Sequence, residues 1–224
     1  MSVTEYGLPQ DCESTLIRGA QKLGVALSGQ QQQLLLRYLG LLHKWNRAYN
    51  LTAIRDPLAM VSRHLLDSLS VVPEIEALQP APQRIADVGT GPGLPGVVLA
   101  IMYPQQQFTL MDSNGKKTRF LQQAKLELGL DNIEIYHGRV EQYPISEPFD
   151  AVISRAFASL EDMLTWTAPL CDQNGYYLAM KGLYPEQELA QMPEGFVLRD
   201  SRPLQVPGSE GERHLLTVQK TQPE

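Results

Sequence analysis

The sequence has little of what would place it in several common classes of protein. Only two cysteines are present, Cys12 and Cys171, and they lie far apart. A disulfide framework or a zinc site needs a denser pattern, so we expect a reducing compartment and no metal. No apolar run approaches the roughly 18 residues that a membrane span needs, and no signal peptide is recognisable. We therefore expect a cytoplasmic protein without a membrane partner.

The chain also lacks an overall surplus of basic residues. Its net charge is −6, which gives no global sign of nucleic-acid binding. The charge is uneven, because residues 1–64 hold seven Lys or Arg and only four Asp or Glu. This leaves open a polyanionic partner at the N-terminal part, or an ordinary solvated helix surface. The length of 224 residues fits one large domain, or a domain with a small cap, and we expect a monomer.

What the sequence does contain is a glycine-rich stretch between a short apolar segment and a longer one. Residues 84–88 predict a strand and residues 97–102 a helix, with four glycines between them: Gly89, Gly91, Gly93 and Gly96. Strand, glycine-rich turn and helix form the first unit of a Rossmann-like fold. Glycines allow a tight turn and let a ligand lie against the backbone. A tight turn without a ligand is the alternative.

The identity of the ligand depends on the residues around these glycines. Gly91, Gly93 and Gly96 fit the pattern of a dinucleotide site. However, Asp87 at the strand end would repel a pyrophosphate, whereas it suits the ammonium and sulfonium of S-adenosylmethionine. Pro92 and Pro95 remove two N–H donors that a phosphate cradle would use. The stretch therefore favours a methyl donor over a nicotinamide or flavin cofactor.

The remaining chain alternates between predicted strands and helices. Strands are expected at residues 108–111, 133–136, 149–154 and 176–180, a helix at 113–128, and a C-terminal hairpin at 196–199 and 214–218. This alternation indicates an α/β fold of about seven strands, five of them largely parallel. Asp112 ends the second strand, 19 residues after Gly93. At that distance a Rossmann-like unit places a carboxylate on the ribose hydroxyls.

The first part of the chain reads as helical. Ser28 is a candidate cap for a long helix, and Asp56 followed by Pro57 predicts the start of another. His64 and Asp67 fall beside the edge of that helix at a spacing typical of a surface hydrogen bond, with a catalytic role as the alternative. The prolines near residue 80 mark a boundary. We predict an N-terminal helical cap over residues 1–75 and a Rossmann-like domain over residues 76–224.

Several separated motifs resemble one known family. They are the stretch 87–96, Ile-Ser-Arg-Ala-Phe-Ala at 153–158, Trp45-Asn46 through Asn50-Leu51-Thr52, Arg63-His64-Leu65-Leu66-Asp67-Ser68 and Gly211-Glu212-Arg213-His214. From about residue 30 to the end, the chain is similar to the RsmG, or glucose-inhibited division protein B, family. The resemblance implies a class I S-adenosylmethionine-dependent methyltransferase that acts on N7 of a guanine in bacterial small-subunit ribosomal RNA. The net charge of −6 disfavours tight binding to bare RNA, so we expect the substrate to be RNA already held in a ribosomal particle.

The resemblance also implies roles for particular residues. Donor contacts are implied at Gly89, Leu94, Val140, Glu141 and Arg155, which join Asp87, Gly91 and Asp112 from the pattern itself. An arginine at a strand end such as Arg155 also pairs with structural acids. Arg139 and Arg213 are implied on the RNA side, and His64 is the further candidate at the reaction site.

The chemistry of N7 methylation fits the absence of an obvious nucleophile constellation. Guanine N7 carries a free lone pair at neutral pH, so orientation against the methyl group supplies much of the rate enhancement. Two alternatives stay open. One is an NAD(P)-dependent oxidoreductase, which would need a catalytic Tyr/Lys, His or Cys beside the cofactor. The other is a module that binds S-adenosylmethionine without transferring its methyl group.

Overall fold

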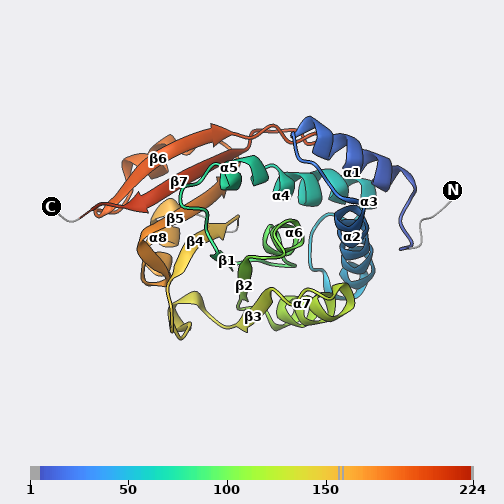
Figure 1. Ribbon diagram of the computed structural model, residues 1–224, viewed down its shortest axis with the longest axis horizontal. Helices are drawn as coiled ribbons and strands as arrows, with labels where there is room; N and C mark the ends of the chain where they lie inside the picture. Colours follow the sequence, from blue (N-terminus) through green and yellow to red (C-terminus); the bar gives the residue numbers. More distant parts are fainter. Residues whose placement is uncertain (1–5, 156, 158, 223–224) are drawn as a thin grey trace.

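A central seven-stranded sheet with helices on both faces organises the chain (Figure 1). The computed structural model describes residues 6–155, 157 and 159–222. Two positions of the motif at 153–158, Ala156 and Ala158, lie outside the described residues. The strands are β1 (Arg84–Val88), β2 (Gln107–Asp112), β3 (Ile133–His137), β4 (Phe149–Ser154), β5 (Cys171–Lys181), β6 (Phe196–Pro203) and β7 (His214–Lys220).

The strand order is β3-β2-β1-β4-β5-β7-β6. The first five strands run parallel, and β7 is antiparallel to both β5 and β6. The predicted sheet of five parallel strands with a C-terminal hairpin is confirmed. β5 begins earlier than predicted, at Cys171, because a register shift between Phe149 and Ala151 lets Cys171 pair with Phe149.

Alternation along the strands divides the core between the two faces of the sheet. Ile85, Ala151 and Leu178 belong to one cluster, whereas their neighbours Ala86, Val152 and Tyr177 belong to the other. The first face is covered by α6 (Gly96–Met102) and α7 (Gly115–Leu128), and the second by α8 (Leu160–Thr167). The shorter elements are η2 (Val140–Gln142), η3 (Ala168–Leu170) and α9 (Glu186–Ala190).

The N-terminal helices pack beside α6 and α7, on the right and along the top of Figure 1. They are α1 (Asp11–Lys22), α2 (Gly29–Tyr49), α3 (Pro57–Met60), the π-helical turn η1 (Val61–Leu66), α4 (Asp67–Leu69) and α5 (Val72–Glu76). Ser28 and Gln31 form a capping box at the start of α2, and the Asp56 carboxylate caps α3. These helices share one hydrophobic core with the sheet, and the division at residue 75 stays a prediction.

The helix expected after Asp56 differs in one respect that matters for the site. It changes into the π-helical turn η1 at Val61, and a π turn shifts the angular positions of the side chains that follow. His64 and Asp67 are only 5% and 1% exposed. The interpretation of these two residues as a surface hydrogen bond is therefore wrong, since both side chains point inward and bond to other partners.

Candidate functional site

The candidate site lies where the parallel strands end. β1 lies between β2 and β4 in the sheet. After β1 the chain adds β2 and β3 on one side of it, and then adds β4 and β5 on the other side. In open α/β sheets such a switch point creates a crevice at the carboxyl ends of the strands. Three neighbouring cavities of about 530, 200 and 360 Å³ line this edge. The 200 Å³ cavity lies between the other two. It shares Gly89 and Lys117 with the 530 Å³ cavity, and His64 and Arg155 with the 360 Å³ cavity.

The glycine-rich loop after β1 is held from beneath by Asp87. Its Oδ2 accepts hydrogen bonds of 2.7 Å from the Thr90 hydroxyl and the Gly96 N–H. A Cβ at Gly96 would collide with Leu110 and with this carboxylate, so only glycine fits there. Burial raises the pKa of Asp87 to about 6. The geometry gives Asp87 a role in shaping the loop, and its direct contact with a ligand stays a prediction.

The backbone at Gly89 and Gly91 adopts φ of +68° and +63°, which favours glycine. A buried hydrogen bond also fixes this loop from the opposite side, where the Tyr38 hydroxyl of α2 donates to the Pro92 carbonyl at 2.8 Å. The N-terminal helices thus hold the glycine-rich loop in place. This loop, including Leu94, lines the 200 Å³ cavity.

Asp112 stands at the end of β2 and lines the 530 Å³ cavity. Its Oδ2 accepts the Gly91 N–H and its Oδ1 the Asn114 N–H, both at 2.8 Å. Lys117 Nζ lies 3.8 Å from the same carboxylate. Asp112 therefore joins the glycine-rich loop to the start of α7 while facing the cavity, which is the place predicted for a carboxylate that binds ribose.

The far wall of the large cavity contains predicted residues and others that the sequence did not reveal. Val140 is buried and Glu141 is exposed in η2, and Arg139 precedes them at the rim. Phe157 and Trp166 add an aromatic wall in which their rings meet edge to face at 5.7 Å. Trp166 is one apolar residue of a short helix in the sequence, and no local signal marks it as part of a site.

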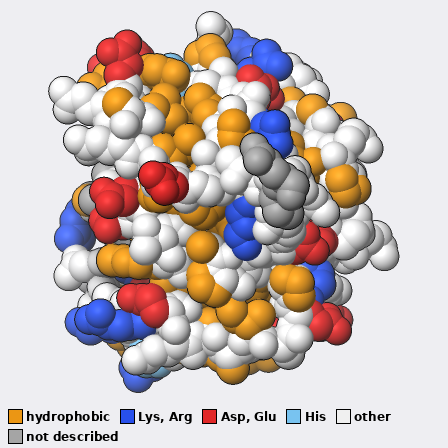
Figure 2. Space-filling model, turned by 90° about the vertical axis from the view of Figure 1, so that its left-hand side faces the viewer, with side chains coloured by type: hydrophobic (Ala, Val, Ile, Leu, Met, Phe, Trp, Pro, Cys, Tyr) orange, Lys and Arg blue, Asp and Glu red, His pale blue; other side chains and the backbone are white. Residues whose placement is uncertain are grey.

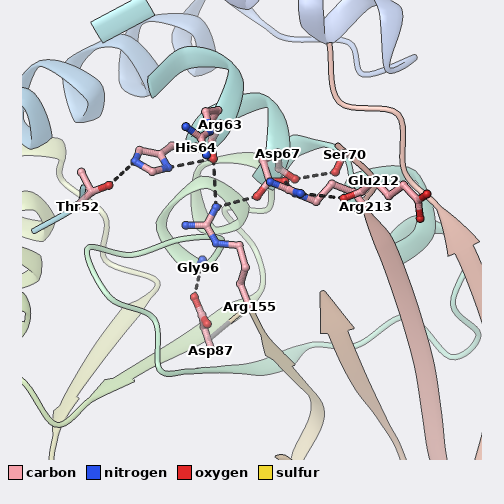
Figure 3. Close-up of polar contacts among 10 residues, drawn as sticks. All are labelled: Thr52, Arg63, His64, Asp67, Ser70, Asp87, Gly96, Arg155, Glu212 and Arg213. Carbon is pink, nitrogen blue, oxygen red and sulfur yellow. Dashed lines mark hydrogen bonds and ion pairs between the residues drawn. The ribbon is translucent and has the colours of Figure 1, made fainter. Parts of the chain in front are cut away.

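The 360 Å³ cavity is built around a buried carboxylate that joins two arginines (Figure 3). Arg155 Nη1 lies 2.7 Å from Asp67 Oδ2, and Arg213 Nε lies 2.9 Å from Asp67 Oδ1. Arg155 also donates to the Arg63 carbonyl at 3.3 Å. The pairing of Arg155 with an acid is thus present, and its contact with a donor stays a prediction. No sequence signal linked Asp67 to either arginine.

His64 separates this cavity from the smaller one and is fixed at both ring nitrogens. Nδ1 lies 3.0 Å from the Arg63 carbonyl, which can only accept, so Nδ1 is assigned the proton. Nε2 then accepts from the Thr52 hydroxyl at 2.9 Å. Burial, followed by the charge of Arg155, lowers the pKa of His64 to about 4. The ring is therefore neutral at physiological pH.

The structure distributes the predicted residues among the three cavities instead of gathering them in one, except for Asp87, which is buried and lines none of the three. Arg139 lines the 530 Å³ cavity and Arg213 the 360 Å³ cavity, so the two arginines predicted on the RNA side lie at different places. Among residues 6–155, 157 and 159–222, no cluster of potential metal ligands is found. Within the same ranges, every helix is too short or too polar to cross a bilayer.

Comparison with solved structures shows the class of fold. The chain superposes on TrmN from Thermus thermophilus with a TM-score of 0.54 at 19% identity, covering 72% of this chain and 53% of that one. It also superposes on an S-adenosylmethionine-dependent methyltransferase from Thiobacillus denitrificans in complex with S-adenosyl-L-homocysteine, with a TM-score of 0.52 at 12% identity and coverage of 68% and 91%. The fold is that of the class I S-adenosylmethionine-dependent methyltransferases, as predicted.

Sequence comparison then gives the family. Residues 31–216 match the family described as GidB, rRNA small subunit methyltransferase G. A protein of that name from Pseudomonas aeruginosa strain LESB58 is 56% identical over 206 residues, covering 92% of this chain and 94% of its own length. Another from Ectopseudomonas mendocina is 55% identical over 221 residues, covering 99% and 100%. The chain belongs to the rRNA small subunit methyltransferase G family, and is a methyltransferase that uses S-adenosylmethionine. This favours the methyl donor over the nicotinamide alternative.

Proposed function

We propose that this protein transfers the methyl group of S-adenosylmethionine to N7 of a guanine in small-subunit ribosomal RNA. The observation that carries the proposal is the adjacency of two kinds of cavity in a chain of this family. A cavity with a carboxylate and an aromatic wall suits the donor, and a cavity lined by arginines suits RNA. They meet at the small cavity beside the glycine-rich loop.

The residues of the large cavity fit the donor chemically. Asp112 offers carboxylate oxygens for ribose hydroxyls, while Val140 and Trp166 offer apolar surface for the adenine ring. Gly89 lines both the large and the small cavity, and Leu94 lines the small cavity, so both lie beside the space proposed for the donor. Asp87 Oδ1 is buried and has no hydrogen-bond partner among the described residues, which favours a cationic group nearby. Glu141 and Arg155 complete the proposed set.

S-adenosylmethionine supplies an activated methyl group on its sulfonium. The protein's task is then to orient guanine N7 in line with that group and to exclude water. No general base is required, because N7 already carries a lone pair. The His64 ring is neutral and both of its nitrogens are hydrogen-bonded. This favours a role for His64 in shaping the junction between the cavities, and it disfavours a role in proton transfer.

RNA binding is proposed to rely on local cations. Figure 2 shows one face of the molecule, on which acidic and basic side chains are interspersed around a band of hydrophobic atoms. Such a face does not suit a broad phosphate contact, and the net charge is −6. Arg139 and Arg213, at two cavity mouths, are placed to stack on an unpaired base or to hold its phosphates.

The acidic overall charge also suggests the form of the substrate. Tight binding to bare RNA normally uses many Lys and Arg contacts. We propose that the protein acts as a cytoplasmic monomer on RNA held within a small ribosomal particle, where ribosomal proteins present the target guanine.

Two assays test the proposal in sequence. S-adenosylmethionine and S-adenosylhomocysteine should raise the melting temperature, whereas NAD and NADP should not. Tritium from labelled donor should then appear in small-subunit RNA. Stabilisation by the donor without transfer to ribosomal RNA in any form would identify the module that binds without catalysis. Stabilisation by NAD or NADP alone would restore the oxidoreductase alternative.

A further inference from the structure

Asp67 occupies a position that the proposed reaction does not by itself explain. Its side chain is 2% exposed, yet it faces two guanidinium groups that come from residues 88 and 146 positions further along the chain. Arg155 immediately follows β4, and Arg213 immediately precedes β7. A single buried carboxylate therefore ties the N-terminal helices, the end of the parallel sheet and the C-terminal hairpin together at one point (Figure 3).

A purely stabilising role accounts poorly for this arrangement. Burying a carboxylate against cations brings little net stability, because the loss of hydration offsets the attraction. Both arginine side chains remain 27% exposed, and both line cavities. Arg155 lines both the 360 Å³ cavity and the small cavity next to the proposed donor site, whereas of these cavities Arg213 lines only the 360 Å³ cavity.

The geometry leaves each guanidinium able to bind something else. An arginine has five N–H donors. Asp67 takes up one nitrogen of each arginine, and the Arg63 and Glu212 carbonyls accept from Nη1 of Arg155 and of Arg213. Within the described part of the chain, Nη2 of both arginines has no hydrogen-bond partner. These groups are thus held in place with donors to spare.

We propose that Asp67 is a positioning residue for methyl transfer. Its two oxygens fix Arg155 against the donor and Arg213 against the target nucleotide, so that the two substrates meet in one orientation. The inference rests on the proposed function, because it assigns the two arginines to the two substrates. Small misplacements at a reacting centre cost about 100-fold in rate, which sets the scale of the expected effect.

The direct test replaces the charge while keeping the shape. In Asp67→Asn we expect kcat for transfer to small ribosomal subunits to fall about 100-fold. The Kd for S-adenosylhomocysteine and the KM for subunits should each change by less than about fivefold, since the arginines remain present. Glu147→Gln is the matched control, because it breaks the exposed Arg84–Glu147 pair at the opposite edge of the sheet. Its kcat should equal that of the parent protein.

A double-mutant cycle separates positioning from general stability. If Asp67 acts through Arg213, Asp67→Asn should lower kcat much less in an Arg213→Gln background than in the parent. Additive losses, or a folded Asp67→Asn protein with kcat within about threefold of the parent, would overturn the inference. Should Asp67→Asn fail to fold, the cycle of Arg155→Lys and Arg213→Lys replaces it. Additive losses there have the same meaning. Absence of transfer by the parent protein would instead refute the proposed function.

Discussion

The carboxylates of Asp87 and Asp112, at the carboxyl ends of the strands, hydrogen-bond to the loops in addition to their proposed contacts with ligands. Asp112 accepts two backbone N–H groups, and Asp87 accepts one backbone N–H and one hydroxyl. Each therefore fixes the shape of a loop whose other surface faces a cavity. At this scale, substitution is expected to affect donor binding both through lost contacts and through a looser loop.

Asp112→Asn tests this double role. The amide keeps one acceptor oxygen and turns an NH₂ group toward a backbone donor. We expect affinity for S-adenosylmethionine to fall about tenfold, because hydrogen bonds to charged groups contribute roughly 1.5–3 kcal/mol. Calorimetry measures the change. Asp172 also accepts the N–H two residues further on, but lies in β5 away from the cavities, so Asp172→Asn is the matched control. Equal affinity in both variants would remove Asp112 from the ribose site.

The buried His64 predicts a dependence of stability on pH. Its pKa is about 4 in the folded protein, below the ordinary value of 6.5. As pH falls from 6.5 to 4, the unfolded chain takes up a proton there and the folded protein does not, so stability is lost. We expect a loss of up to about 3 kcal/mol that His64→Gln does not show. Urea unfolding of both proteins at pH 7 and pH 4.5 measures it, and parallel profiles would contradict the account.

At the scale of elements, α2 and the glycine-rich loop form one unit. Tyr38 is fully buried, and its hydroxyl reaches the Pro92 carbonyl from 54 residues earlier in the chain. The N-terminal helices therefore support the donor site directly. Leu51 and Thr52, in the segment after α2, line the same small cavity.

Tyr38→Phe should weaken the protein and the site together. Removal of a buried hydroxyl leaves the Pro92 carbonyl without its partner, which costs about 1–3 kcal/mol of stability. The freed loop should lower affinity for S-adenosylmethionine several-fold. Tyr177→Phe removes another buried hydroxyl, bonded to the Ala168 carbonyl, and should lower stability without affecting the donor. Melting curves measure the stability of the two variants, and calorimetry measures their affinity for S-adenosylmethionine. Equal donor affinities in the two variants would contradict the supporting role of α2.

The elements also show which features the sequence could reveal. Local signals found the glycine-rich loop, the end of β2 at Asp112 and the caps at Ser28 and Asp56, because each depends on residues a few positions apart. The link between Asp67 and its arginines spans 88 and 146 residues, so no local pattern could reveal it. The π-helical turn that brings His64 and Asp67 inward has no sequence signature either.

For the whole molecule, charge is the property that bears on substrate choice. In a protein with 19 Lys and Arg and 25 Asp and Glu, basic side chains must be concentrated at the surface where RNA binds. Arg139 is exposed at the rim of the large cavity. This arrangement predicts weak binding to bare RNA, with activity that depends on particular arginines instead of a general basic surface.

Arg139→Ala should therefore raise the KM for subunits about tenfold while leaving donor affinity unchanged. Loss of one phosphate contact should also reduce the slope of log affinity against log salt by about 1. Arg199→Ala, on the exposed face of β6, is the control and should change neither quantity. Filter binding across a salt series provides the measurement. Weakened donor binding in Arg139→Ala would place that residue in the donor site instead.

The central claim is tested most directly by locating the transferred methyl group. Purified protein and labelled S-adenosylmethionine are incubated with small ribosomal subunits from a strain that lacks the gene, and the label is mapped along the RNA. We expect label at N7 of one guanine, with more on subunits than on bare RNA. Label on protein, on DNA, on another atom or base, or on no component of the subunit would contradict it.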